Sequence, residues 1–448
     1  MSRLRRILAV WAAKATGFAC RITGKQGVTL AGQIALKIDP DILKELSSQV
    51  KEKIFVTCGT NGKTTTNNLL CSAIEAEGKK VVCNHTGSNM LNGVAAAFAQ
   101  SASLNGNLKA DYACIEVDEA STVRIFPHFK PDYMVLTNLF RDQLDRYGEI
   151  DITMNLLKKA MQMAPEMEVI VNGDDSLSTY LAMESGNPYV TFGIGEQYFK
   201  DQKDSGEIRE GTFCKKCGSK MEYHFYHYSQ LGDYYCPECG FKRPELTYNA
   251  LHVHAGENLS FEVNGTAIEA NYRGFYNIYN ILAAYAAGKE AGLKLTAYNR
   301  VLRKYSPENG RNEAFHIKGT DIILNLAKNP AGFNQNISAV MEDTKEKDLI
   351  ILINDNSQDG IDVSWLWDVD FDRFQDAGIH SITVSGIRCR DMQLRLKYVD
   401  IPSILEPDIE KAIQDRIQDG VKNLYVLVNY TGLYKTHNIL KKLEGEQK

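Results

Sequence analysis

One segment, Gly59-Thr60-Asn61-Gly62-Lys63-Thr64-Thr65, constrains the fold of this chain more than any other. The apolar run Lys53–Thr57 before it predicts a short buried strand, and a helical pattern follows from Thr64 to Ala76. Backbone N–H groups in such a turn, together with the N-terminus of the next helix, bind phosphate oxygens. The order strand, glycine-rich loop, helix therefore predicts a nucleotide-phosphate site.

Side chains in and near this loop suit the charges of a nucleotide. Lys63 supplies a cation to the β- and γ-phosphates, and the Thr64 hydroxyl suits Mg²⁺. Glu116 lies at the end of a predicted strand, where a carboxylate faces the phosphates at the carboxyl edge of a sheet. Mg²⁺ prefers hard oxygen ligands, so we expect Thr64 and Glu116 to bind it, with a solvated surface acid as the alternative for Glu116. We expect ATP at Gly59, Thr60, Asn61, Gly62, Lys63, Thr64 and Thr65.

Strand and helix patterns alternate along the chain, which predicts a mostly parallel sheet with helices on both faces. After the loop, the expected strands are Lys80–Cys83, Tyr112–Val117, Tyr133–Leu136 and Val169–Val171. Near Arg311 a second α/β unit begins, with expected strands at Asp321–Leu324, Leu349–Ile353, Ser381–Val384 and Leu424–Val428. We therefore expect an N-terminal segment over 1–45, a central ATP-binding domain over 46–308 and a C-terminal α/β domain over 309–448.

Two CxxC pairs interrupt this alternation and predict an inserted zinc ribbon at about 205–245. The pairs are Cys214/Cys217 and Cys236/Cys239, and Gly218 and Gly240 follow them, which allows tight knuckle turns. Four thiolates make a closed tetrahedral site, so we expect a structural Zn²⁺. The alternatives are four unrelated buried cysteines, or a ribbon that binds nucleic acid through the lysines beside the knuckles. The other six cysteines are scattered, which suits a reducing compartment.

The N-terminus is basic, with no acidic residue before Asp39. Its apolar run Ile7–Ala13 is too short to span a bilayer. A basic amphipathic helix on an anionic membrane or a partner and an ordinary capping helix are both compatible with this pattern. A basic start before a short apolar stretch is also compatible with a signal peptide, but ATP chemistry favours the cytoplasm. The formal net charge of −5 gives no whole-chain case for nucleic-acid binding.

A polar turn in the C-terminal unit, Asn354-Asp355-Asn356-Ser357-Gln358-Asp359-Gly360, follows a β-rich run. Such turns often carry functional groups. Asp355 and Asp359 could hold ammonium or orient a general base, and they could equally be turn residues.

Together these residues resemble the Mur ligase superfamily. The matching segments are the GTNGKTT loop, Glu116, Thr137-Asn138-x3-Asp142-x2-Asp145-Arg146-Tyr147, Asn172-Gly173-Asp174-Asp175, Gly274-Phe275-Tyr276-Asn277-x2-Asn280-x2-Ala283-Ala284 and Gly310-Arg311-x-Glu313. The resemblance implies that the loop binds ATP, that Thr64 and Glu116 bind Mg²⁺, that Asn280 contacts the adenine and that Arg311 reaches the phosphates. It also implies an acyl phosphate, made from a carboxylate and attacked by an amine.

The chain also departs from the superfamily pattern. The loop begins near residue 59, so we expect no full UDP-sugar domain before it. Gln143 stands where several members have a metal-binding histidine, and Leu157 stands where a carbamylated lysine is expected, with Lys158 one place off. These positions argue against the usual second metal and the carbamate.

A narrower resemblance joins the ribbon to the segment Leu326–Asn334 and to Asp355 with Asp359-Gly360-x-Asp362-x-Ser364-Trp365-Leu366-Trp367-Asp368. These features are similar to the MurT family, the ligase subunits of lipid II isoglutaminyl synthase. This implies ATP-dependent amidation of the D-glutamate α-carboxylate of the lipid II stem peptide, and a partner glutaminase of the GatD type in a heterodimer. It implies a catalytic role for Asp355, a cytoplasmic enzyme that can lie at the inner membrane face, and no nucleic-acid partner.

Two other functions remain open from the sequence. A folylpolyglutamate-synthase-like ligase also lacks the UDP-sugar domain, although a Cys₄ ribbon is not part of its pattern. An ATPase that binds nucleic acid through the ribbon is the second, and salt-dependent binding would reveal it. No cysteine here sits in a glutaminase-type nucleophile elbow, which agrees with ammonia coming from a partner.

Overall fold

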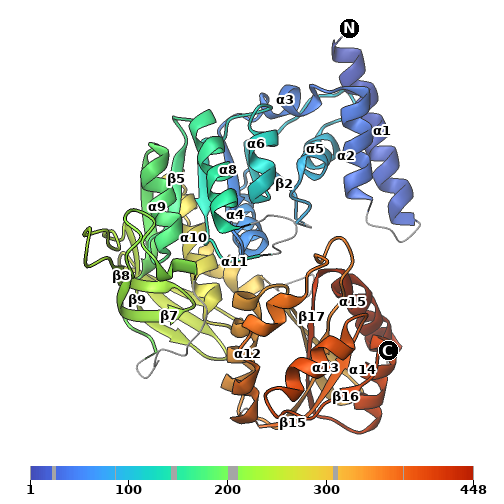
Figure 1. Ribbon diagram of the computed structural model, residues 1–448. Coiled ribbons are helices and arrows are strands. Elements are labelled where there is room, and N and C mark those ends of the chain that lie inside the picture. The colour runs from blue at the N-terminus through green and yellow to red at the C-terminus, as the bar shows by residue number, and fades with distance from the viewer. Residues whose placement is uncertain are drawn as a thin grey trace.

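Two twisted sheets, each flanked by helices, make up most of the molecule (Figure 1). The computed structural model describes residues 2–22, 27–85, 87–142, 149–199, 210–305, 311–376 and 378–446. In Figure 1 the first sheet and its helices run from blue to yellow, and the second sheet lies below them in orange and red.

The first sheet has nine strands in the order β11-β10-β9-β6-β5-β4-β1-β3-β2. Its strands are β1 (Lys53–Cys58), β2 (Val81–Cys83), β3 (Tyr112–Glu116), β4 (Tyr133–Leu136), β5 (Glu168–Asn172), β6 (Tyr189–Ile194), β9 (Tyr248–Ala255), β10 (Leu259–Val263) and β11 (Thr266–Ala270). From β2 to β9 all pairings are parallel, and β9, β10 and β11 form an antiparallel meander at one edge. The sequence predicted β1 to β5 within two residues, because they are continuous apolar runs buried on both faces. It did not predict the meander.

Helices cover both faces of this sheet. They are α4 (Lys63–Ala76), α5 (Leu91–Ser101), α6 (Thr122–Ile125), α8 (Ile150–Met163), α9 (Ser176–Ser185), α10 (Tyr276–Glu290) and α11 (Tyr298–Lys304), with the 3₁₀ turns η1 (Glu119–Ser121) and η2 (Glu210–Thr212). Twelve of the fifteen residues of α10 are buried, from Asn277 to Gly288. The small side chains Ala283, Ala284, Ala286 and Ala287 let this helix pack closely against α4 and the sheet.

The second sheet has six strands in the order β12-β13-β17-β14-β15-β16. They are β12 (Arg311–Ile317), β13 (Thr320–Leu326), β14 (Lys347–Leu352), β15 (Ile379–Ser385), β16 (Ile404–Leu405) and β17 (Asn423–Val428). Only β12 and β13 pair antiparallel. The helices α12 (Pro330–Glu342), α13 (Cys389–Lys397), α14 (Ile409–Gln418) and α15 (Tyr430–Gly445), with the 3₁₀ turns η3 (Ser364–Asp368) and η4 (Phe371–Asp376), complete this unit.

Three helices precede β1: α1 (Ser2–Ile22), α2 (Val28–Ile38) and α3 (Ile42–Ser47). The first packs on α2, and α2 packs on α5 of the central unit. Helices α2 and α5 approach closely at Gly32, where a Cβ would lie 1.7 Å from the Asn92 carbonyl oxygen. No helix within the described ranges is long and apolar enough to cross a bilayer.

Between β6 and β9 the chain leaves the first sheet and forms a separate hairpin, β7 (Glu222–Tyr228) and β8 (Leu231–Tyr235). The four cysteines of the CxxC pairs lie at its base. The expected insertion thus emerges beside the sheet rather than within it. Residues 205–209 of the expected insertion lie outside the described residues.

Candidate active site

The Gly59–Thr65 loop joins β1 to α4 in the centre of the first sheet. Gly59 and Gly62 have φ of 122° and 85°, which L side chains rarely adopt. A Cβ at Gly59 would lie 2.2 Å from Thr137 Oγ1, and one at Gly62 would lie 2.0 Å from Asn280 Oδ1. Glycine is therefore required at both positions by conformation and by space.

The segment after β4 holds this loop in place. Asn138 Oδ1 accepts a hydrogen bond from Asn61 N at 2.9 Å, and Asn138 Nδ2 donates to the Asn61 carbonyl at 3.1 Å. Thr137 Oγ1 donates to the same carbonyl at 2.7 Å. These contacts fix the backbone that would face the phosphates, and they explain why Thr137-Asn138 accompanies the loop.

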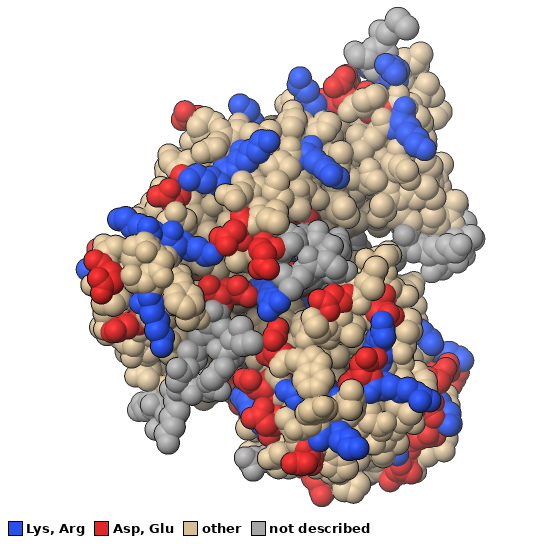
Figure 2. Space-filling view, viewed as in Figure 1, with Lys and Arg blue, Asp and Glu red and all other residues tan. Residues whose placement is uncertain are grey.

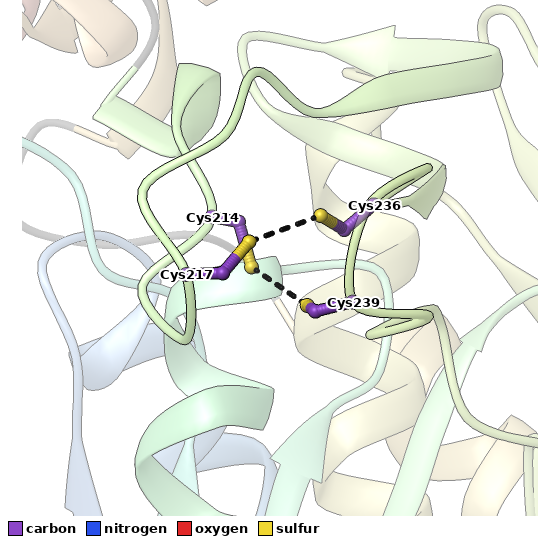
Figure 3. A group of neighbouring side chains, drawn as sticks. All are labelled: Cys214, Cys217, Cys236 and Cys239. Carbon is purple, nitrogen blue, oxygen red and sulfur yellow. Dashed lines mark hydrogen bonds between the residues drawn. The ribbon is translucent and has the colours of Figure 1, made fainter.

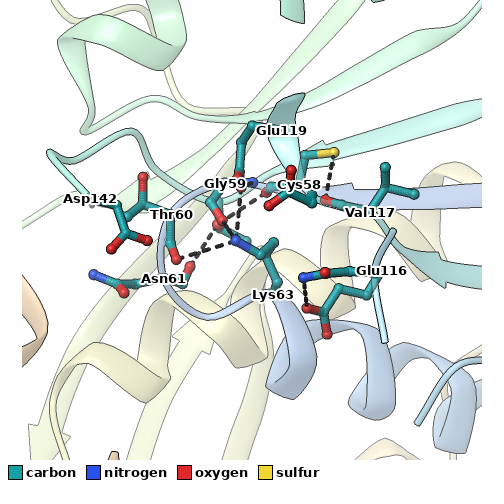
Figure 4. A network of polar contacts seen from close by, with 12 residues as sticks. Cys58, Gly59, Thr60, Asn61, Lys63, Glu116, Val117, Glu119 and Asp142 are labelled. Atoms are coloured by element: carbon teal, nitrogen blue, oxygen red, sulfur yellow. Dashed lines mark hydrogen bonds and ion pairs between the residues drawn. The ribbon is translucent and has the colours of Figure 1, made fainter. Parts of the chain in front are cut away.

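Lys63 is buried at the base of the loop (Figure 4). Its Nζ lies 2.8 Å from Glu119 Oε1 and 2.5 Å from the Gly59 carbonyl oxygen. Burial alone would lower the pKa of Lys63, but the carboxylates of Glu119, Glu116 and Asp118 outweigh it and raise the pKa. The three carboxylates therefore favour the charged form of Lys63. The sequence did not identify Glu119 as its partner, although Glu119 lies three positions after the predicted ligand Glu116.

Thr64 and Glu116, which the sequence predicts as oxygen ligands of Mg²⁺, lie side by side. Thr64 Oγ1 lies 2.5 Å from Glu116 Oε2, and Asn89 Nδ2 donates to Glu116 Oε1 at 2.9 Å. A Cβ at Gly87 would lie 3.2 Å from Thr64 Oγ1 and 3.4 Å from Glu116 Oε2, so glycine leaves room beside both ligands. A hydroxyl and a carboxylate next to open space fit a hard divalent cation.

A cavity of about 400 Å³ opens over the loop and is lined by both α/β units. Lys63, Thr64 and Glu116 line it from the first unit, together with Asn280 and Tyr276 of the α10 segment. From the second unit come Asn325, Leu326, Lys328, Gly332, Gln335, Asn336, Gln358 and Tyr430. Its volume is that of a small-molecule site, and the polar side chains that line it around the loop suit a phosphorylated ligand.

Polar contacts join the second unit to the loop and to the segment that follows β4. Asn61 and Asn329 pair their amides: Asn61 Nδ2 donates to Asn329 Oδ1 at 3.4 Å, and Asn329 Nδ2 donates to Asn61 Oδ1 at 3.2 Å. Lys328 Nζ lies 2.5 Å from Asp142 Oδ2. Asn329 also caps α12, because its Oδ1 accepts from Gly332 N at 2.8 Å. The segment Leu326–Asn334 is part of the resemblance seen in the sequence, but its contact with the loop could not be predicted there.

The polar turn that follows β14 holds the two candidate aspartates in different settings. Asp355 Oδ2 accepts from Arg388 Nε at 2.8 Å, and its side chain is 20% exposed. Asp359 is buried, and it accepts hydrogen bonds from the backbone N–H and the hydroxyl of Thr431 at the start of α15. Burial raises the pKa of Asp359, and the Thr431 contacts partly offset this. Of the described residues in this turn, Gln358 lines the cavity and Asp355 does not.

The remaining candidate positions are placed as follows. Arg311 begins β12, and its side chain lies outside the described residues, as do Gln143, Asp145, Arg146 and Tyr147. Leu157 is fully buried in the apolar core. Lys158 Nζ points away from the loop to Glu184 Oε2 at 3.3 Å.

The four cysteines of the CxxC pairs converge (Figure 3). Their sulfur atoms all lie within 4.8 Å of one another. Cys214 Sγ is 3.6 Å from Cys239 Sγ, and Cys217 Sγ is 3.5 Å from Cys236 Sγ. Gly218 N and Gly240 N donate to the carbonyls of Cys214 and Cys236, which closes each knuckle. Four thiols in two knuckles match the donor set of a structural zinc site.

The tip of the β7–β8 hairpin reaches the cavity, a contact that no pattern in the sequence predicts. Tyr228 lines the cavity, and Gln230 Nε2 donates to the Leu139 carbonyl at 2.5 Å and to Asp175 Oδ1 at 3.2 Å. The knuckles at one end of the hairpin and the cavity wall at the other are thus parts of one small unit.

Two sequence families match the chain. The Mur ligase middle domain matches residues 56–237, and the MurT ligase C-terminal family matches residues 326–433. The chain is 36% identical over 432 residues to the MurT subunit of lipid II isoglutaminyl synthase (glutamine-hydrolyzing) of Staphylococcus aureus (strain COL), covering 96% of each. It is 34% identical over 448 residues to the subunit of the same name from Streptococcus pneumoniae (strain ATCC BAA-255 / R6), covering 98% of this chain and 97% of that one.

A solved structure has the same fold. The pseudomurein peptide ligase type C from Methanothermus fervidus superposes with a TM-score of 0.70 at 21% identity, covering 89% of this chain and 80% of that one. At this level of identity the likeness concerns the fold, which is that of the Mur ligases.

Proposed function

This chain belongs to the MurT family of Mur ligases, and from this premise we propose that it is the ligase subunit of a lipid II isoglutaminyl synthase. It uses ATP to activate the D-glutamate α-carboxylate of the lipid II stem peptide and converts it to the amide. The observation that carries the proposal is the contact of the second unit with the phosphate loop through Asn61–Asn329, beside the ion pair Lys328–Asp142. The family-specific segment meets the ATP-binding element at this contact.

The chemistry has two steps. A carboxylate oxygen attacks the γ-phosphorus, the bond to ADP breaks, and an acyl phosphate forms. Ammonia then attacks the acyl carbon, the bond to phosphate breaks, and the nitrogen loses a proton. Lys63, held by Glu119 at 2.8 Å, stabilises the negative charge that grows on the phosphates. Mg²⁺, held by Thr64 and Glu116, would neutralise phosphate charge in the same place.

We assign the other binding roles by the same reasoning. The residues Gly59–Thr65 cradle the phosphates, Asn280 contacts the adenine and Arg311 reaches the phosphates. An acyl phosphate must be shielded from water, and a cavity walled by both units supplies that shielding. We place the domain boundaries at 45/46 and 308/309, which leaves the cavity at the junction of the last two domains.

We assign the nitrogen step to Asp355. Its carboxylate, held by Arg388, sits in the turn that also supplies Gln358 to the cavity wall. Asp355 positions or deprotonates incoming ammonium, which a glutaminase subunit of the GatD type releases. The chain and that subunit form a heterodimer in the cytoplasm, where ATP is available, and the lipid substrate comes from the inner face of the membrane.

We also propose that Cys214, Cys217, Cys236 and Cys239 hold a structural Zn²⁺. The close approach of the four sulfurs supports this. The zinc would fix the base of the hairpin whose tip carries Tyr228 into the cavity, so it would act on the site without touching a reactant. Nucleic acid is not part of this proposal.

The test is reconstitution from purified parts. The chain, its glutaminase subunit, glutamine, ATP and lipid II should give a product in which an amide replaces one carboxylic acid, read by mass spectrometry. Addition of a glutamate residue would indicate a folylpolyglutamate-synthase-like ligase instead. An unchanged lipid II, under conditions where ATP is hydrolysed, would refute the assigned substrate.

A further inference from the structure

Helix α1 places its smallest apolar side chains inward and its largest outward. Ala9 and Ala13 are fully buried against the rest of the protein. On the opposite side, Leu4 is 66% exposed, Trp11 54% and Phe18 64%. A helix that only covers a core does the reverse, because burying large side chains gives most of the stability. The outer side chains therefore serve something other than the fold of this chain.

The outer residues follow one line along the helix. Leu4, Leu8, Trp11, Ala15 and Phe18 are spaced four, three, four and three residues apart, and all five are exposed. At 3.6 residues per turn they fall within an arc of about 80°. We call these five residues the outer stripe. Leu104, which is also exposed, extends it, because Trp11 Nε1 donates to the Leu104 carbonyl at 2.7 Å.

All charged side chains on α1 are basic. The helix from Ser2 to Ile22 contains no aspartate or glutamate. Arg5 lies on one side of the outer stripe by helical position, and Arg3 and Lys14 lie on the other. Arg3 and Arg5 are exposed, whereas Lys14 Nζ donates to the Gln100 carbonyl at 2.5 Å. In Figure 2 the surface over α1 is mostly tan with basic side chains in blue.

We propose that the outer stripe docks on an anionic lipid surface, with α1 lying in the plane of the interface. Large apolar side chains on one face, flanked by basic residues, are the pattern of a helix that rests in the headgroup region. The exposed basic flanks, Arg3 and Arg5, and the absence of any acidic residue from α1 complement anionic headgroups.

The helices on which α1 packs, α2 and α5, reach the cavity. Thr29, at the start of α2, and Met90, just before α5, both line the cavity. Leu30 and Met90 are themselves exposed apolar residues. The N-terminal end of α2, on which α1 packs, therefore forms one rim of the cavity. This role rests on the proposed function: docking of α1 would hold the cavity rim against the membrane that carries the lipid substrate.

Binding to vesicles tests the inference with the full chain. We would compare vesicles of phosphatidylglycerol and phosphatidylcholine with vesicles of phosphatidylcholine alone, by sedimentation. The double variant Leu4→Ser/Phe18→Ser is matched with Ile152→Ser/Met183→Ser, which removes two side chains of similar exposure from α8 and α9. Trp11 stays in place in both variants, because of its hydrogen bond to Leu104.

The expected result is binding to the anionic vesicles that weakens about tenfold in Leu4→Ser/Phe18→Ser and is unchanged in the control pair. Ala15→Leu adds apolar area to the stripe and should tighten binding several-fold, a gain that misfolding cannot produce. Equal binding by both double variants, or no gain from Ala15→Leu, would overturn the inference. So would loss of a copurifying protein, with vesicle binding unchanged, in the stripe variant.

This test is independent of the chemistry, because the vesicles contain no lipid II and no ATP is added. Amidation of a short-chain lipid II analogue in solution should be the same in wild type and Leu4→Ser/Phe18→Ser. Normal vesicle binding without any amidation would count against the proposed function and leave the docking surface intact.

Discussion

The phosphate loop and the turn at Asp355 are the two ends of the proposed reaction, and they are built differently. At the loop every charged group has a partner within this chain: Lys63 has Glu119, and Glu116 has Thr64 and Asn89. The Asp355 turn is more open, and its neighbours Ile361 and Ile387 are 67% and 60% exposed. The contrast agrees with the proposal that one chain activates the carboxylate and a second chain delivers the nitrogen.

The largest loss of amidation should come from a substitution in the phosphate loop. Lys63→Ala removes the buried cation and leaves Glu119 unpaired next to the phosphate site. We expect amidation to fall by about 10³-fold or more, whether nitrogen comes from glutamine or from ammonium chloride. Lys158→Ala, which breaks only the surface pair with Glu184, is the matched control and should keep its rate. A Lys63→Ala enzyme with near-normal kcat would remove the loop from the chemistry.

A variant at Asp355 tests the second step of the proposed reaction, the attack by ammonia. Asp355→Asn keeps the size of the side chain and weakens its pairing with Arg388, so we expect amidation to fall about 10²-fold. ATP affinity, measured by calorimetry, should stay the same, because Asp355 is outside the cavity wall. If ATP affinity falls together with the amidation rate, or if the amidation rate is unchanged, then ATP binding and the nitrogen step do not depend on separate residues.

The proposed zinc site lies away from both the phosphate loop and the Asp355 turn, so loss of the zinc should have an intermediate effect on amidation. Cys217→Ser should lower the metal content from one zinc per chain, measured by elemental analysis, and loosen the hairpin that carries Tyr228. We expect KM for ATP to rise several-fold with a smaller change in kcat. Cys389→Ser, a buried cysteine of α13 away from the ribbon, should keep its zinc. A wild type without zinc would refute the metal assignment.

The smallest effect concerns Asp359, which anchors the Asp355 turn to α15. Because its pKa is raised in the folded protein, the native state holds that proton more tightly than the unfolded state does. Stability should therefore fall as pH rises from the ordinary aspartate pKa of about 4 through the raised value. Asp359→Asn should remove this part of the dependence, measured by denaturant unfolding across that range. An identical pH profile in both proteins would contradict the assignment.

Features encoded locally could be predicted from the sequence. The parallel strands are apolar runs, and the strand β1, the loop and the helix α4 form one contiguous motif. The β10–β11 hairpin was also encoded locally but was not predicted. Its turn is Asn264-Gly265, with φ of 48° and 78°, the dipeptide that two-residue hairpins favour.

Long-range contacts could not be predicted, because no local pattern encodes them. Asn61 and Asn329 are 268 positions apart, and nothing near either residue specifies the other. The same holds for Tyr228, which enters the cavity wall from the ribbon. The proximity of Thr64 and Glu116 could be predicted because Thr64 follows β1 and Glu116 ends β3, two strands of one parallel sheet whose carboxyl ends share an edge.

The central claim, an acyl phosphate formed on the loop and opened by ammonia, can be tested by isotope transfer. Lipid II labelled with ¹⁸O in the D-glutamate α-carboxylate is converted with the chain, its glutaminase subunit, glutamine and ATP. Inorganic phosphate is then analysed by mass spectrometry. We expect one labelled oxygen in the phosphate for each amide formed. Amide formation with unlabelled phosphate would contradict the account.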